Sequence, residues 1–181
     1  MLGVTLDAAG VSPTIVVGGE VPDLGTNAKV GTGDYLVSEA DESDGTFLKL
    51  HPYIAVVTNV EDDHMDHYGT MENIIKAFRQ FIENTKEQDG YAVLCFENKN
   101  LREIIQKKID RGFLSYAIDA PADYQAKNLA HGGKGISFDV YHGEEKLGHV
   151  DLNIPGRHNV LDAMACIVTG LSIGVPSEFC P

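Results

Sequence analysis

The sequence has few basic residues. Lys and Arg together account for 14 of 181 residues, against 27 Asp and Glu, which gives a formal net charge of −13 at pH 7. Nucleic-acid binding depends largely on phosphate neutralisation by basic side chains, so we expect no nucleic-acid partner. A nucleotide is still compatible with this charge, because a metal ion can neutralise its phosphates locally.

Long apolar runs and paired cysteines are also missing. No segment approaches the roughly 20 apolar residues of a membrane-spanning helix. Residues 1–10 lack the basic and apolar regions of a secretory signal. Cys95, Cys166 and Cys180 are odd in number and widely spaced, which fits neither a zinc site nor a disulfide framework. We therefore expect no membrane association and a reducing, cytoplasmic environment.

Two common nucleotide-binding motifs are absent as well. The sequence has no Gly-x-x-x-x-Gly-Lys-Ser/Thr phosphate loop and no Gly-x-Gly-x-x-Gly turn. These absences argue against ATP hydrolysis by this polypeptide alone.

Short apolar runs alternate with amphipathic segments over residues 53–118. Runs of this kind are typical of buried parallel strands covered by helices on both faces. The rhythm predicts an α/β fold with a mostly parallel, doubly wound sheet. Strands are expected at 14–19, 34–40, 53–60, 91–96 and 113–118, helices at 70–85, 101–109 and 159–170, a helix end capped by Gly10 at 1–10, and a loop at 20–32.

The pattern changes after Pro121. Strand-like runs at 122–130, 135–142 and 146–154 are separated by glycine-containing turns at 131–134 and 143–145. Such turns are typical of hairpins. We therefore expect a small antiparallel sheet, at about residues 122–154, appended to the main sheet.

Two acidic clusters follow apolar runs. Residues 39–44 read Glu-Ala-Asp-Glu-Ser-Asp, and residues 61–66 read Glu-Asp-Asp-His-Met-Asp. Ligands of open α/β sheets bind outside the carboxyl ends of the strands, so these positions favour a cation site over a solvated acidic loop. Oxygen ligands suit magnesium, whereas His64 suits zinc or manganese better and, taken alone, would be structural or solvated.

A third motif, Pro155-Gly156-Arg157-His158-Asn159, leads into the last predicted helix. Asn159 is a good N-cap residue, and spacing alone favours that structural role. The alternative is a purine or phosphate contact that uses the positive helix end and the polar side chains.

In this order, the three motifs resemble those of the Mur ligases. Residues 38–44 are most similar to the branch that adds L-alanine to UDP-N-acetylmuramate, and a muropeptide-recycling branch is the nearest alternative. The resemblance implies ATP and Mg²⁺ as cofactors, with Glu39 and His64 as magnesium ligands and His158 and Asn159 at the adenine. Some sister ligases carry a carbamylated lysine where this chain has Phe78 and Arg79, and the alanine-adding branch also lacks it.

The resemblance covers only the central, ATP-binding domain of a three-domain ligase. It implies that residues 1–181 are part of that domain, beginning after its phosphate loop, without the UDP-sugar and C-terminal domains. We therefore expect the isolated chain to be inactive and its open core surface to favour self-association. The competing hypothesis is a non-catalytic acidic module that binds a metal or a partner and does not depend on Glu39 or His64.

Overall fold

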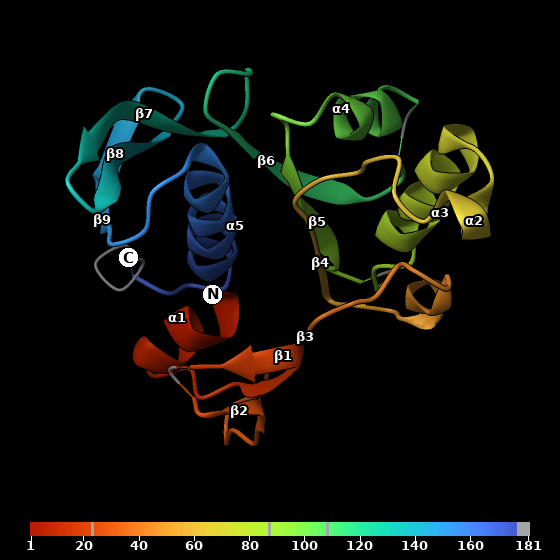
Figure 1. Cartoon of the computed structure of the whole chain (residues 1–181), viewed down its shortest axis with the longest axis horizontal. Coiled ribbons are helices and arrows are strands. Elements are labelled where there is room, and N and C mark those ends of the chain that lie inside the picture. Colours follow the sequence, from red (N-terminus) through yellow and green to blue (C-terminus); the bar gives the residue numbers. More distant parts are fainter. Residues whose placement is uncertain (23, 87, 108, 177–181) are drawn as a thin grey trace.

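The computed structural model describes residues 1–22, 24–86, 88–107 and 109–176 (Figure 1). The larger of its two sheets has the strand order β4-β5-β6-β7-β8-β9. Neighbours from β4 to β7 are parallel, and β7, β8 and β9 are antiparallel. The strands are β4 (Ile54–Val57), β5 (Tyr91–Cys95), β6 (Gly112–Ala117), β7 (Tyr124–Gly132), β8 (Gly135–His142) and β9 (Glu145–Leu152).

The antiparallel strands expected after Pro121 are present, but they continue the main sheet. Tyr116 and Ala117, at the end of β6, pair in parallel with Tyr124 and Gln125 at the start of β7. The chain therefore passes from β6 to the neighbouring position in the sheet, where β7 runs in the same direction. The hairpins β7–β8 and β8–β9 follow.

The separate sheet lies at the N-terminal side instead, with the order β2-β1-β3. It consists of β1 (Thr14–Val21), β2 (Thr26–Lys29) and β3 (Leu36–Ser38). The strand expected at 34–40 is confirmed, but it pairs with β1 and not with the main sheet. The prediction of a loop throughout 20–32 is wrong, because residues 26–29 pair antiparallel with β1. They carry no alternating apolar pattern, so pairing with β1 determines this strand.

Helices cover both faces of the main sheet, as expected for a doubly wound fold (Figure 1). Helix α5 packs against the strands from β4 to β8 and against α1, while α3 and α4 contact each other on the other side. Thr70 caps α3 by accepting a hydrogen bond from the Asn73 N–H. The helices are α1 (Leu2–Ala8), α2 (Met65–Tyr68), α3 (Met71–Glu83), α4 (Lys99–Gln106) and α5 (Arg157–Ser172), with a 3₁₀ turn at Thr46–Lys49.

One hydrophobic core joins the sheet to these helices. Its largest fully buried side chains come from β5, β6 and β8, from α3, α4 and α5, and from Val60 just after β4. This explains why the apolar periodicity located these elements. None of the helices found in the described ranges has the length and apolar character to cross a membrane. Cys95 and Cys166 are buried free thiols, and Cys180 lies outside the described residues.

Candidate functional site

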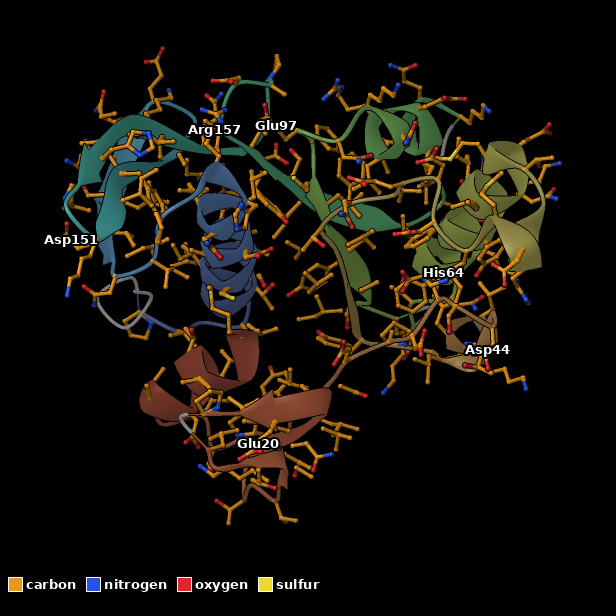
Figure 2. The ribbon with its side chains drawn as sticks, in the orientation of Figure 1. Glu20, Asp44, His64, Glu97, Asp151 and Arg157 are labelled. Atoms are coloured by element: carbon orange, nitrogen blue, oxygen red, sulfur yellow. The ribbon has the colours of Figure 1, made fainter. Side chains whose placement is uncertain are left out.

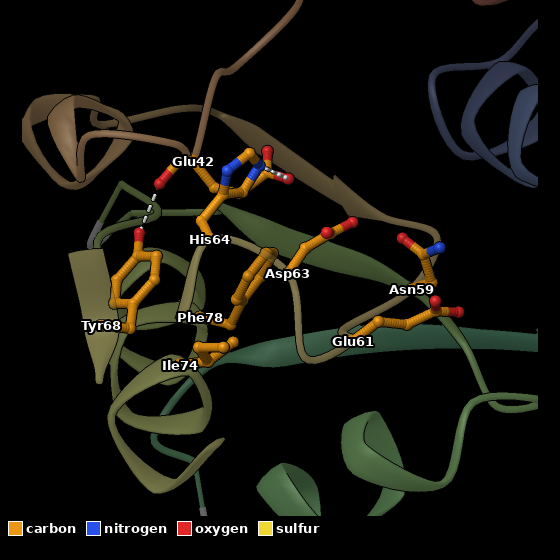
Figure 3. A pocket seen from close by; sticks show the side chains of 8 residues that line it. All are labelled: Glu42, Asn59, Glu61, Asp63, His64, Tyr68, Ile74 and Phe78. Carbon is orange, nitrogen blue, oxygen red and sulfur yellow. Dashed lines mark hydrogen bonds and ion pairs between the residues drawn. The ribbon is translucent and has the colours of Figure 1, made fainter. Parts of the chain in front are cut away.

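The segment that follows β4 turns back over α3 and encloses a small polar cavity (Figure 3). Its volume is about 50 Å³, and a water molecule needs roughly 10–15 Å³ of such space. The cavity therefore has room for a cation with a few waters. Its lining is formed by Glu42, Asn59, Glu61, Asp63, His64, Tyr68, Ile74 and Phe78.

The two acidic clusters meet in this cavity through Glu42 and His64. His64 Nε2 lies 3.7 Å from Glu42 Oε1, and both side chains are about two-fifths exposed, at 38% and 40%. The Tyr68 hydroxyl donates a 2.5 Å hydrogen bond to the Glu42 carbonyl, which ties the first cluster to α2. Sequence reasoning did not single out Tyr68, and its position at the end of a four-residue helix gave no periodic signal.

Asp41 and Asp44 have local structural roles. Asp41 accepts a hydrogen bond from the Ser43 N–H and Asp44 accepts one from the Thr46 N–H, each at 2.9 Å. Hydrogen bonds from Ser43 hold the pKa of Asp41 below its usual range, and those from Thr46 do the same for Asp44. These carboxylates shape the loop that carries Glu42 toward His64.

Glu39 directly follows β3 and does not line the cavity. Its Oε2 atom accepts a 2.6 Å hydrogen bond from the Gly18 N–H of β1. A Cβ atom at position 18 would stand 3.3 Å from that oxygen, so glycine lets the carboxylate lie close to the strand. The structure thus brings His64 together with Glu42 and places Glu39 at the edge of the small sheet.

The donor set of the cavity fits magnesium better than zinc. Glutamate, aspartate and asparagine oxygens outnumber the single imidazole, and oxygen is the ligand that magnesium prefers. Across the described ranges, no three His, Cys, Asp or Glu side chains converge closely enough to hold a metal. A cation here would keep several waters or take further oxygens from a phosphate, as magnesium commonly does.

Phe78 and Arg79 take different positions on α3. Phe78 lines the cavity together with His64. Arg79 Nε donates a 2.9 Å hydrogen bond to Glu83 Oε1 and its Nη1 donates to the Lys107 carbonyl. The α3 side of the cavity, formed by Ile74 and Phe78, is therefore apolar.

The third motif forms the first turn of α5. Gly156 is the N-cap, with φ at 112°, and Asn159 is the third helical residue, so the capping role favoured for Asn159 is wrong. The Asn159 Nδ2 atom instead donates to the Pro155 carbonyl at 2.7 Å and lies 3.1 Å from His158 Nε2. No hydrogen bond to Asn159 Oδ1 is found among the described residues, which leaves one acceptor at the exposed helix start.

Comparisons with known proteins identify the family. A family model described as the Mur ligase middle domain matches residues 19–170. This chain belongs to the Mur ligase family. The family is one of ATP-dependent ligases.

Individual relatives of this Mur ligase chain cover almost all of it. The UDP-N-acetylmuramate–L-alanine ligase of Pelotomaculum thermopropionicum is 46% identical over 179 residues, which are 98% of this chain and 38% of that protein. A crystal structure of UDP-N-acetylmuramate–alanine ligase from Thermotoga maritima matches with a TM-score of 0.79 at 25% identity, over 97% of this chain and 40% of the other. The chain thus spans about 38% of the length of the curated relative.

A structure of a ligase from Neisseria meningitides that acts with L-alanyl-γ-D-glutamyl-meso-diaminopimelate has the same fold. Its TM-score is 0.86 at 25% identity, over 99% of this chain and 58% of the other. The comparisons therefore confirm the α/β fold and the family, while the roles of Glu39, His64, His158 and Asn159 stay predictions.

Proposed function

We propose that this chain carries the cation- and nucleotide-binding part of an ATP-dependent ligase that joins L-alanine to UDP-N-acetylmuramate. The observation that carries the proposal is the meeting of the two acidic clusters at Glu42 and His64, 3.7 Å apart, in an oxygen-rich cavity. The 46% identity to a ligase of that name over nearly the whole chain supports the choice of substrate.

Glu39 and His64 are proposed as ligands of two different magnesium ions. His64 lines the cavity with Glu42 and Asp63, whereas Glu39 lies outside it at the edge of the small sheet. When bound, such cations would offset the repulsion between a substrate carboxylate and the phosphates of ATP. The chain's own contribution is to place Glu42 beside His64 on a loop whose backbone is held by hydrogen bonds to Asp41, Asp44 and Tyr68, which reduces the ordering needed on binding.

His158 and Asn159 are the proposed contacts to the adenine base. They lie in the first turn of α5, where unpaired backbone N–H groups favour negative charge and polar ligands. The free Oδ1 atom of Asn159 could accept a hydrogen bond from the exocyclic amine of adenine, and His158 offers an exposed ring beside it.

The proposed reaction forms an amide in two steps. The muramyl carboxylate attacks the γ-phosphorus of ATP, giving an acyl phosphate and ADP. The amine of L-alanine then attacks the acyl carbon, phosphate leaves, and the amine loses a proton. A polypeptide of these 181 residues has no phosphate loop in its sequence, so we expect it to bind ligands without completing this reaction. The cytoplasm, the expected location, is part of the same proposal.

A muropeptide-recycling ligase is the second candidate within the family. The observation that favours it is the TM-score of 0.86 to the Neisseria meningitides structure, against 0.79 for the alanine ligase of Thermotoga maritima at equal identity. Sequence similarity favours alanine addition, because relatives that are 46%, 43% and 45% identical are named as alanine ligases.

A chimaeric ligase tests these candidates. The matching 179-residue segment of the Pelotomaculum thermopropionicum enzyme is replaced by this chain. Phosphate release from ATP is then measured with UDP-N-acetylmuramate and either L-alanine or the tripeptide L-alanyl-γ-D-glutamyl-meso-diaminopimelate. Release with L-alanine is expected, and His64→Ala should lower its rate by about 10–100-fold, the scale seen when a metal site is disturbed. Release with the tripeptide alone would show the recycling activity. A folded chimaera without release in either assay, or one indifferent to Glu39→Ala and His64→Ala, would favour the non-catalytic module.

A further inference from the structure

Glu97 follows β5 and binds the loop that follows β6. Its Oε2 atom accepts hydrogen bonds from the backbone N–H groups of Ile118, Asp119 and Ala120, at 2.9, 3.0 and 3.4 Å. Partial burial pushes the pKa of Glu97 upward, but the three N–H donors and the nearby Arg157 outweigh it and hold the pKa below its usual range. The carboxylate is therefore ionised at neutral pH and fixes the loop directly.

The same loop holds the first residue of α5. Arg157 Nη2 donates a 2.7 Å hydrogen bond to Asp119 Oδ2, and Figure 2 shows Glu97 and Arg157 close together at one end of the molecule. One continuous set of contacts thus runs from Glu97 through Asp119 to Arg157, which immediately precedes His158 and Asn159.

This set of contacts is better suited to fixing a position than to stabilising the fold. Arg157 and Asp119 are 50% and 74% exposed, and exposed ion pairs contribute little to stability. A basic residue in the first turn of a helix also opposes the helix dipole. Asp119 offsets this cost, and Glu97 fixes the backbone of Asp119.

The residues just after Glu97 contact the segment that leads into the second acidic cluster, residues 61–66. The side-chain amides of Asn98 and Asn100 both donate to the Val60 carbonyl, at 3.3 and 2.7 Å. Val60 immediately precedes Glu61, a residue of the polar cavity. The turn at 97–100 therefore contacts the cavity segment on one side and the loop that holds α5 on the other.

We propose that Glu97 is a positioning residue for the nucleotide base: through residues 118–120 and the Asp119–Arg157 pair it holds His158 and Asn159 in their binding orientation. The proposal rests on the proposed function of the α5 start. Glu97 itself touches neither base nor cation. Its loss should weaken nucleotide binding while leaving cation binding at the cavity intact.

The test is a titration of the 181-residue chain with ADP, followed by NMR of backbone amides, with Mn²⁺ affinity measured in parallel. Glu97→Ala should weaken ADP binding by about tenfold, the scale expected for a group that orients a ligand-contacting side chain. The amides of His158 and Asn159 should shift even without nucleotide. Glu97→Gln should restore most of the affinity, because its amide oxygen can still accept backbone hydrogen bonds.

Asp139→Ala is the matched control. Asp139 also accepts three hydrogen bonds, from Lys146, Asn128 and His149, but on the outer face of β8. Its removal should lower thermal stability without changing ADP affinity. Equal ADP affinity in Glu97→Ala and the unmodified chain, or equal losses in Glu97→Ala and Asp139→Ala, would overturn the positioning role alone. Absence of ADP binding to the unmodified chain would contradict the proposed base site, and the role of Glu97 with it.

Discussion

His64 holds a backbone conformation that few non-glycine residues adopt. Its φ angle is 55°, in the left-handed region, at the residue that precedes α2. Strain of this kind costs about 1–3 kcal/mol and is concentrated at functional sites. The conformation directs the imidazole toward Glu42, so a conflict between stability and ligand binding is expected at this residue.

His64→Gly should separate the two effects. Glycine adopts positive φ without penalty but adds freedom to the unfolded chain, so the free energy of unfolding should stay unchanged or rise by up to about 1 kcal/mol. Mn²⁺ affinity, measured by isothermal titration, should fall by about tenfold because a ligand is lost. His51→Gly is the control, since His51 is exposed and not among the residues with positive φ. It should lose some stability and keep Mn²⁺ affinity; a marked loss of stability in His64→Gly would count against stored strain.

Asp139 supplies a pH-dependent contribution to stability. Hydrogen bonds from Lys146, Asn128 and His149 hold its pKa well below the usual range. Because the folded-state pKa is depressed, this contribution is present above about pH 4, the ordinary Asp pKa, and is lost as the pH falls further. The difference in thermal midpoint between the unmodified chain and Asp139→Asn should be constant from pH 6 to 5 and shrink below pH 4. A difference that stays constant down to pH 2 would show that the charge of Asp139 contributes nothing.

The main-sheet strands and the helices longer than α2 could be predicted because their signal is local. Ile74 and Ile82 on α3, for example, recur at helical spacing and are both buried. Residues 26–29 and the pairing of β3 could not be predicted, because they depend on contacts with β1 that no local pattern records. Asn159 was misjudged for a related reason: its residue type favours N-caps, but Gly156 takes that place with a φ angle of 112°.

Gly156 sets the position of the α5 start. A Cβ atom there would lie 2.6 Å from His158 Cε1, and the positive φ disfavours other residues. Gly156→Ala should therefore weaken ADP binding by displacing His158. Gly174→Ala, at the other end of α5, carries the same kind of strain, with φ at 85° and no atom within 4 Å of the added Cβ.

Both glycine variants should lose about 1–2 kcal/mol of stability, measured by urea unfolding. Only Gly156→Ala should also lose ADP affinity, measured by titration calorimetry. Equal ADP affinity in the two variants would mean that the geometry of the helix start does not matter for the base.

For the whole molecule, the small sheet leaves apolar side chains exposed despite the net charge of −13. Val16 on β1 is 44% exposed and Leu36 on β3 is 64% exposed. We expect concentration-dependent association in sedimentation velocity experiments, weakened by Leu36→Thr and by Val16→Thr. Ile154→Thr, which changes a residue that is 42% exposed after β9, is the control and should have no effect. A monomer at all concentrations would contradict the expectation that exposed apolar side chains of the small sheet cause association.

The central claim is that the Glu42–His64 cavity and the α5 start serve one nucleotide and its cation. The most direct measurement is an NMR titration of the 181-residue chain with ADP and substoichiometric Mn²⁺. We predict paramagnetic broadening centred on residues 59–64 and ADP-induced shifts at His158 and Asn159. Broadening spread evenly over the acidic surface, together with unshifted resonances at His158 and Asn159, would contradict the account.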